Sequence, residues 1–117
     1  MKPVLLVVED DDAWWYTLGR LFGQRAELIF AASVAEADRI FTERGGDLAG
    51  IVVDGCLNHE DRFDTGQLVR YFRKRFAGPI VAASSVYNRE LMEAGCTHQA
   101  ETKDAAAQIA LENASQR

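Results

Sequence analysis

Short apolar runs alternate with amphipathic segments five times along this chain. The runs are rich in β-branched residues and leucine, which is typical of strands buried on both faces of a sheet. They are Val4–Val8, Leu28–Phe30, Ile51–Val53, Ile80–Ala83 and a weaker one at Thr97–Glu101. Apolar residues at helical spacing follow each run. They predict helices over 13–22, after Ser33, after Thr65, over 86–94 and over 104–112.

Polar caps and glycines mark the ends of the expected helices. Asp11 or Asp12 can cap the first, and Thr65 can cap the third. Ser33 and Glu36 have the spacing of a capping box. Gly95 is expected to end the fourth helix, which is short. Five strand–helix units therefore predict an α/β fold, a doubly wound parallel sheet of five strands with right-handed crossovers.

Polar residues follow the ends of the expected strands, where open α/β sheets bind their ligands. Glu9 and Asp10 follow the first strand, Asp54 the third and Ser84 the fourth. If the first and third strands are neighbours, three carboxylates meet in one crevice and repel one another. A hard cation such as Mg²⁺ relieves that repulsion. A carboxylate beside the cation can then attack an electrophilic phosphorus.

Five segments of the chain, in this order, resemble the receiver domain of bacterial response regulators. The segments that carry the resemblance are 5–10, 51–54, 66–69, 79–84 and 93–95. The resemblance covers nearly the whole chain and implies a strand order of 2-1-3-4-5 and one domain over residues 1–117. It implies a phosphoacceptor at Asp54 and Mg²⁺ held by Glu9, Asp10, Asp54 and the backbone carbonyl of Cys56. Ser84 lies where the family places a phosphate-sensing hydroxyl.

The same resemblance implies signalling in place of enzymatic turnover of a substrate. A histidine kinase or phosphotransfer protein would supply the phosphoryl group, and the domain would catalyse only its own phosphorylation and dephosphorylation. A separate protein target would read the phosphorylated state, because the expected units use the whole of the chain.

The chain also departs from the family pattern after the third and fifth strands. Receivers carry a lysine and a cis-bonded proline after strand five. Here Thr102 falls at the lysine position and Lys103 at the proline position, so we expect no cis peptide and keep both residues as candidates. Gln99 replaces an aromatic residue of strand five, and the loop over 55–64 is longer than usual.

Plainer interpretations stay open for each candidate. Glu9 and Asp10 can serve as acids at a helix N-terminus, Asp54 can be a turn residue, and Ser84 can cap a helix, although Ser85 suits that role better. Two other functions also stay open. One is a degenerate receiver that works as an interaction module without phosphorylation. The other is a small phosphohydrolase, which needs a second acid near Asp54.

The aromatic run Trp14-Trp15-Tyr16 opens the first helix. Spacing places Trp14 toward the core and leaves Trp15 and Tyr16 near the surface beside the acids. The latter two either pack against neighbouring loops or form a docking surface for the kinase or phosphotransfer protein.

Composition narrows the class of protein further. The chain has 117 residues, 48% of them hydrophobic, and a net charge of -5, as in an ordinary acidic globular domain. The negative charge disfavours nucleic acid and anionic lipid as partners. The apolar runs are too short to span a bilayer. Two cysteines form neither a zinc pattern nor a disulfide framework, so we expect a cytoplasmic protein.

Overall fold

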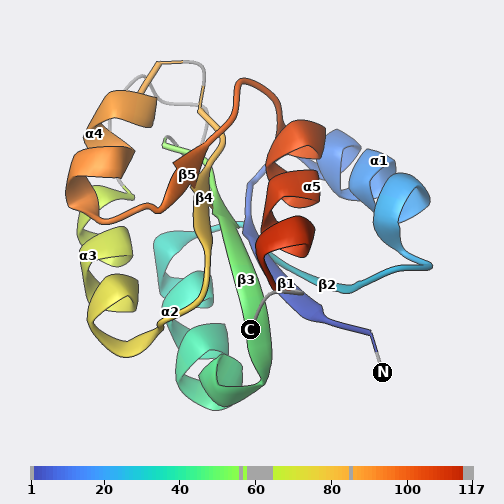
Figure 1. The fold of residues 1–117 in the computed structure, drawn as a ribbon, viewed down its shortest axis with the longest axis horizontal. Coiled ribbons are helices and arrows are strands. Elements are labelled where there is room, and N and C mark those ends of the chain that lie inside the picture. Colours follow the sequence, from blue (N-terminus) through green and yellow to red (C-terminus); the bar gives the residue numbers. More distant parts are fainter. Residues whose placement is uncertain (1, 56, 58–64, 85, 115–117) are drawn as a thin grey trace.

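The computed structural model describes residues 2–55, 57, 65–84 and 86–114, and these form a parallel sheet covered by helices (Figure 1). The strands are β1 (Val4–Val8), β2 (Glu27–Ala31), β3 (Leu48–Val53), β4 (Ile80–Ala82) and β5 (His98–Gln99). Their order in the sheet is β2-β1-β3-β4-β5, and all four pairings are parallel. The expected fold class and strand order are therefore confirmed.

Helices cover both faces of the sheet. They are α1 (Asp12–Phe22), α2 (Val34–Arg44), α3 (Gly66–Arg75), α4 (Asn88–Ala94) and α5 (Lys103–Ala114), with a 3-10 turn, η1, at Gly45–Asp47. Figure 1 shows α1 and α5 on one side of the sheet and α2, α3 and α4 on the other. In the described part of the chain, no helix has the length and apolar character needed to cross a membrane.

Alternate residues of β1 pack into two separate hydrophobic clusters, one on each face of the sheet. Leu6 and Val8 belong to the cluster under α2, α3 and α4. Leu5 and Val7 belong to the cluster under α1 and α5. Such alternation is the two-residue period of a strand, and it explains why β1 is apolar at every position.

The two clusters are built from different side chains. Phe41 is the centre of an aromatic group in the first cluster, and its ring centroid lies 4.5 Å from that of Phe72. In the second cluster α5 contributes three buried alanines, Ala106, Ala107 and Ala110. A Cβ atom on Gly50 of β3 would lie 3.4 Å from the Cβ of Ala110. Small residues thus let α5 pack closely on the sheet, and this fixes the position of its first residue, Lys103.

Most of the helix caps predicted from the sequence are present in the structure. Asp11 caps α1, because its Oδ1 accepts a hydrogen bond from the N–H of Ala13 at 2.9 Å. Ser33 caps α2 in the same way, and its Oγ lies 3.1 Å from the N of Glu36. Gly95 ends α4 with a φ of 132°, a conformation that favours glycine.

Three expectations about element ends were wrong. The hydroxyl of Thr65 makes no cap for α3 and donates instead to the carbonyl oxygen of Asp54 at 2.7 Å. Helix α4 begins at Asn88 and not at residue 86, and β5 is two residues long instead of five. The first difference arises from a hydrogen bond to a residue eleven positions away, and the second from a turn in which Oγ of Ser84 accepts from the N–H groups of Val86 and Tyr87.

Candidate functional site

The carboxyl ends of β1 and β3 bring three acidic residues together. Val8 and Val53 are paired in the register of these strands, so the residues that follow them are adjacent. Glu9, Asp10 and Asp54 each offer a carboxylate oxygen, and these oxygens all lie within 4.8 Å of one another. Such a spacing permits one cation to contact all three side chains.

Glu9 is the most buried member of this acid cluster, with 3% of its surface exposed. Its Oε2 accepts a hydrogen bond from the N–H of Asp11 at 3.1 Å. Its Oε1 is buried and makes no hydrogen bond within the described part of the chain. Burial raises the pKa of Glu9, and the negative charge of Asp54 raises it further, whereas Lys103 opposes both effects.

Lys103 projects from the first turn of α5 into the acid cluster. Its Nζ lies 3.4 Å from Oε1 of Glu9 and 3.7 Å from Oδ2 of Asp54. The hydroxyl of Thr102, the other candidate, accepts from the N–H of Ala105 at 3.3 Å and so caps α5. Lys103 reaches the acids because its long side chain spans the distance from the helix. Among the described residues no peptide bond is cis.

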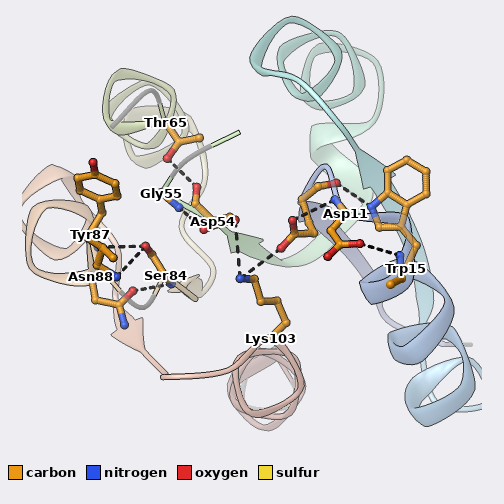
Figure 2. Close-up of polar contacts among 12 residues, drawn as sticks. Asp11, Trp15, Asp54, Gly55, Thr65, Ser84, Tyr87, Asn88 and Lys103 are labelled. Carbon is orange, nitrogen blue, oxygen red and sulfur yellow. Dashed lines mark hydrogen bonds and ion pairs between the residues drawn. The ribbon is translucent and has the colours of Figure 1, made fainter. Parts of the chain in front are cut away.

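The backbone around Asp54 is fixed by two neighbours that sequence reasoning did not place in the site. Oδ1 of Asp54 accepts from the N–H of Gly55 at 2.8 Å. The carbonyl oxygen of Asp54 accepts from Thr65, eleven residues later, as Figure 2 shows. The first contact is a local turn, and the Asp-Gly pair is a usable signal for it. The second has no local signal in the sequence.

Ser84 follows β4, but its hydroxyl is engaged by the backbone of the next turn. Oγ accepts hydrogen bonds from the N–H groups of Val86 at 3.3 Å and Tyr87 at 3.0 Å. The N–H of Ser84 donates to Oδ1 of Asn88 at 2.8 Å. Asn88, which sequence reasoning also missed, donates from Nδ2 to the carbonyl of Ala100 at 2.8 Å and so ties the ends of β4 and β5 together. Ser84 itself therefore serves as the capping residue of this turn.

Gly55 connects Asp54 with the turn at Ser84. A Cβ atom built on Gly55 would lie 2.6 Å from Cβ of Tyr87 and 3.1 Å from Oγ of Ser84. Any larger residue at position 55 would collide with Tyr87. Cys56, expected to offer its carbonyl to the metal, lies outside the described residues, as do positions 58–64 of the expected loop and Ser85.

In the aromatic run, Trp15 has the most specific contacts. Its indole Nε1–H donates to the carbonyl oxygen of Glu9 at 2.7 Å, and its ring stacks on Phe30 with centroids 5.4 Å apart. Trp15 is thus half-buried, as the first of the two interpretations holds. Trp14 packs against the cluster under α1 and α5. Tyr16 is 66% exposed.

The same arrangement of strands and helices occurs in solved structures of receiver domains. One is the response regulator receiver domain from Clostridium thermocellum, with a TM-score of 0.78 and 20% identity over 98% of this chain and 95% of that one. A second, from Francisella, has a TM-score of 0.78 and 18% identity over 99% and 98% of the two chains. The chain has the receiver-domain fold.

A third receiver domain, described as CheY-like and from Methylobacillus flagellatus, gives a TM-score of 0.74 and 20% identity, covering 97% of this chain and 99% of that one. Scans against protein-family models and against curated protein sequences give no match. The expected resemblance to receivers is thus confirmed in three dimensions.

Proposed function

We propose that this receiver-fold chain accepts a phosphoryl group on Asp54 in a Mg²⁺-dependent reaction. The donor would be the phosphohistidine of a cytoplasmic histidine kinase or phosphotransfer protein, and a separate protein would read the phosphorylated state. One observation carries the proposal: Glu9, Asp10 and Asp54 converge within 4.8 Å, and the amine of Lys103 faces two of them.

The chemistry of the acid cluster fits a hard divalent cation. Glu9 contributes a buried Oε1 that has an ion pair with Lys103 at 3.4 Å but no hydrogen bond of normal length in the described part of the chain, so it keeps room for a cation. Carboxylate oxygens are the ligands that Mg²⁺ prefers. Glu9, Asp10 and Asp54 would hold the ion, which when bound supplies positive charge that neutralises phosphoryl oxygens.

The residues of the chain orient the nucleophile and its product. Gly55 and Thr65 hold the backbone and one carboxylate oxygen of Asp54, so that the second oxygen faces Lys103. In the transfer, a carboxylate oxygen of Asp54 forms a bond to phosphorus as the bond from phosphorus to the imidazole nitrogen breaks. The electron pair of that bond stays on the nitrogen. The Lys103 ammonium then pairs with an oxygen of the transferred group.

A degenerate receiver that binds partners without phosphorylation is the second candidate. Two observations favour it. The hydroxyl of Ser84 already accepts two backbone hydrogen bonds from the next turn, and these restrict the direction in which its O–H can donate to a phosphoryl group. Gln99 is exposed on the short strand β5, at the position where the resemblance implies an aromatic residue.

Phosphorylation by a small acyl phosphate separates these two functions. The protein is incubated with Mg²⁺ and acetyl phosphate, and its intact mass is measured. We expect one added phosphoryl group, lost in Asp54→Asn and when the Mg²⁺ is chelated. Asp38→Asn, which changes an exposed acid of α2, is the matched control and should be phosphorylated like the wild type. A wild-type protein with no adduct would favour the degenerate receiver.

A further inference from the structure

Two consecutive tryptophans of α1 contact opposite ends of the ion pair between Glu9 and Lys103. Trp15 contacts the backbone of Glu9, and the amine of Lys103 lies over the ring of Trp14 at 5.9 Å from its centroid. We infer that Trp14 and Trp15 position this ion pair for phosphoryl transfer. The inference rests on the proposed function and concerns positioning residues of the same site.

Trp15 fixes Glu9 through its main chain. The 2.7 Å hydrogen bond to the carbonyl of Glu9 spans six residues and is shorter than the usual distance for an N–H donor. The ring also stacks on Phe30 of β2, with centroids 5.4 Å apart, and this contact restricts rotation of the indole. Glu9 is thereby held at the point where β1 ends, and its side chain enters the acid cluster from a fixed direction.

Trp14 restricts the lysine. The side chain of Lys103 is 18% exposed and has a flexible stem of four carbons, which must be ordered for the amine to stay between two carboxylates. The ring of Trp14 provides a third favourable contact for the ammonium, a cation–π contact at a partly desolvated site. Because α1 and α5 pack on the same face of the sheet, the ring and the amine are held on rigid elements.

The position of Lys103 on a helix makes this support relevant. It is the first residue of α5, where the positive end of the helix dipole disfavours an ammonium group. The two carboxylates and the ring of Trp14 offset that effect. Without the ring, we expect the amine to spend more time in solvent and less time beside Asp54.

Chemical labelling of Lys103 tests the part played by Trp14 without requiring phosphorylation. The protein is treated briefly with an amine-acylating reagent, and the modified fraction at Lys103 is measured by peptide mass spectrometry. Trp14→Met keeps an apolar side chain but removes the aromatic face, and we expect labelling to rise about threefold to tenfold. Trp14→Phe keeps a ring and should give a rate close to that of the wild type.

Tyr16→Leu is the matched control, because it removes an exposed aromatic residue of the same helix that makes no contact with the lysine in the described structure. Unchanged labelling in Trp14→Met, or an equal rise in Tyr16→Leu, would overturn the assignment. If Trp14→Met does not fold, an NMR measurement on the wild-type protein tests the contact between Trp14 and Lys103. The ring current of Trp14 should shift the Lys103 methylene protons upfield relative to other lysines, and an unshifted signal contradicts the contact.

Phosphorylation kinetics then connect the contact to function. The rate of adduct formation from acetyl phosphate is measured for Trp14→Met, Lys103→Gln and the double variant. If the tryptophan acts through the lysine, Trp14→Met slows the wild type about threefold to tenfold and has no further effect when Lys103 is already glutamine. Additive effects contradict the inference. A wild type that forms no adduct, with labelling as expected, rejects the proposed function and leaves the contact intact.

The affinity of the protein for Mg²⁺ tests the part played by Trp15. Trp15→Phe keeps a ring for the stack on Phe30 and removes the N–H that holds Glu9. We expect Mg²⁺ to bind several-fold more weakly in this variant, measured by the fluorescence of the remaining Trp14, with little change in melting temperature. Equal affinities for Mg²⁺ in the variant and the wild type would show that Trp15 has no part in positioning Glu9.

Discussion

The two halves of the ligand-binding edge use their polar groups differently. At the ends of β1 and β3, three carboxylates converge, and Oε1 of Glu9 has an ion pair with Lys103 at 3.4 Å but no hydrogen bond of normal length within the described residues. At the ends of β4 and β5, the hydroxyl of Ser84 and the amide of Asn88 make hydrogen bonds to the protein backbone.

This difference favours the β1–β3 half as the one that would bind a ligand. Three carboxylates converge there, and the amine of Lys103 supplies one positive charge against them, so a bound cation would stabilise the folded protein. A satisfied network of Ser84 and Asn88 stabilises the fold with no ligand at all. The proposed cation binding and phosphoryl acceptance would therefore use the β1–β3 half, whereas the described hydrogen bonds of the β4–β5 half serve the fold.

The largest effect should come from removing the charge of Glu9. Burial is the main cause of its raised pKa, so the folded protein retains a proton on Glu9 at pH values where the unfolded chain has released it. Stability without metal thus falls as the pH rises above the ordinary glutamate pKa. Glu9→Gln should raise the melting temperature of the metal-free protein at neutral pH by a few degrees, and the pH dependence should flatten.

The same variant should lose the response to Mg²⁺. A wild-type protein at a Mg²⁺ concentration a hundred times its dissociation constant gains about 2.7 kcal/mol in the free energy of unfolding. Glu9→Gln should gain almost none, as measured by thermal unfolding with and without the ion. Asp12→Asn, which changes an exposed acid at the start of α1, should respond like the wild type. An unaltered response in Glu9→Gln would remove the β1–β3 half from the proposed metal site.

A smaller effect should follow from a substitution that creates a steric clash between the two halves. Gly55→Ala places a Cβ atom 2.6 Å from Cβ of Tyr87, so either the turn at Ser84 or the backbone after Asp54 must move. Overpacking of this kind costs about 1–3 kcal/mol in the free energy of unfolding. Chemical denaturation measures it. Gly46→Ala is the matched control, because a Cβ there meets nothing within 4 Å. Equal stability of the two variants would show that Gly55 does not link the halves.

The β1–β3 half was the part of the site that the sequence predicted best. The apolar runs before Glu9 and Asp54 predicted each strand together with the acid that follows it, and the resemblance to receivers implied that the two strands are neighbours. Local pattern also predicted the short helix α4 and its end at Gly95.

The β4–β5 half was less well predicted, because the hydrogen bond between Asn88 and Ala100 joins residues twelve positions apart. Asn88 joins Ser84 to Ala100 through its amide, and nothing in the spacing of these residues reveals the link. The choice between Thr102 and Lys103 also depended on where α5 begins. Local propensity defines such an end to within a few residues only, whereas side-chain direction changes at every residue.

The smallest effect should come from Ser84, and it separates a structural hydroxyl from a phosphate-sensing one. Ser84→Ala removes the acceptor for the N–H groups of Val86 and Tyr87, so we expect a loss of about 1 kcal/mol in the free energy of unfolding. Gln99→Ala, at an exposed position of β5, should change stability by less than about 0.5 kcal/mol. If the hydroxyl serves the turn, Ser84→Ala forms the Asp54 adduct from acetyl phosphate within about twofold of the wild-type rate. The opposite result is a Ser84→Ala variant as stable as the wild type that forms the Asp54 adduct much more slowly. In that case Ser84 acts on the phosphoryl group, and the β4–β5 half belongs to the reacting site.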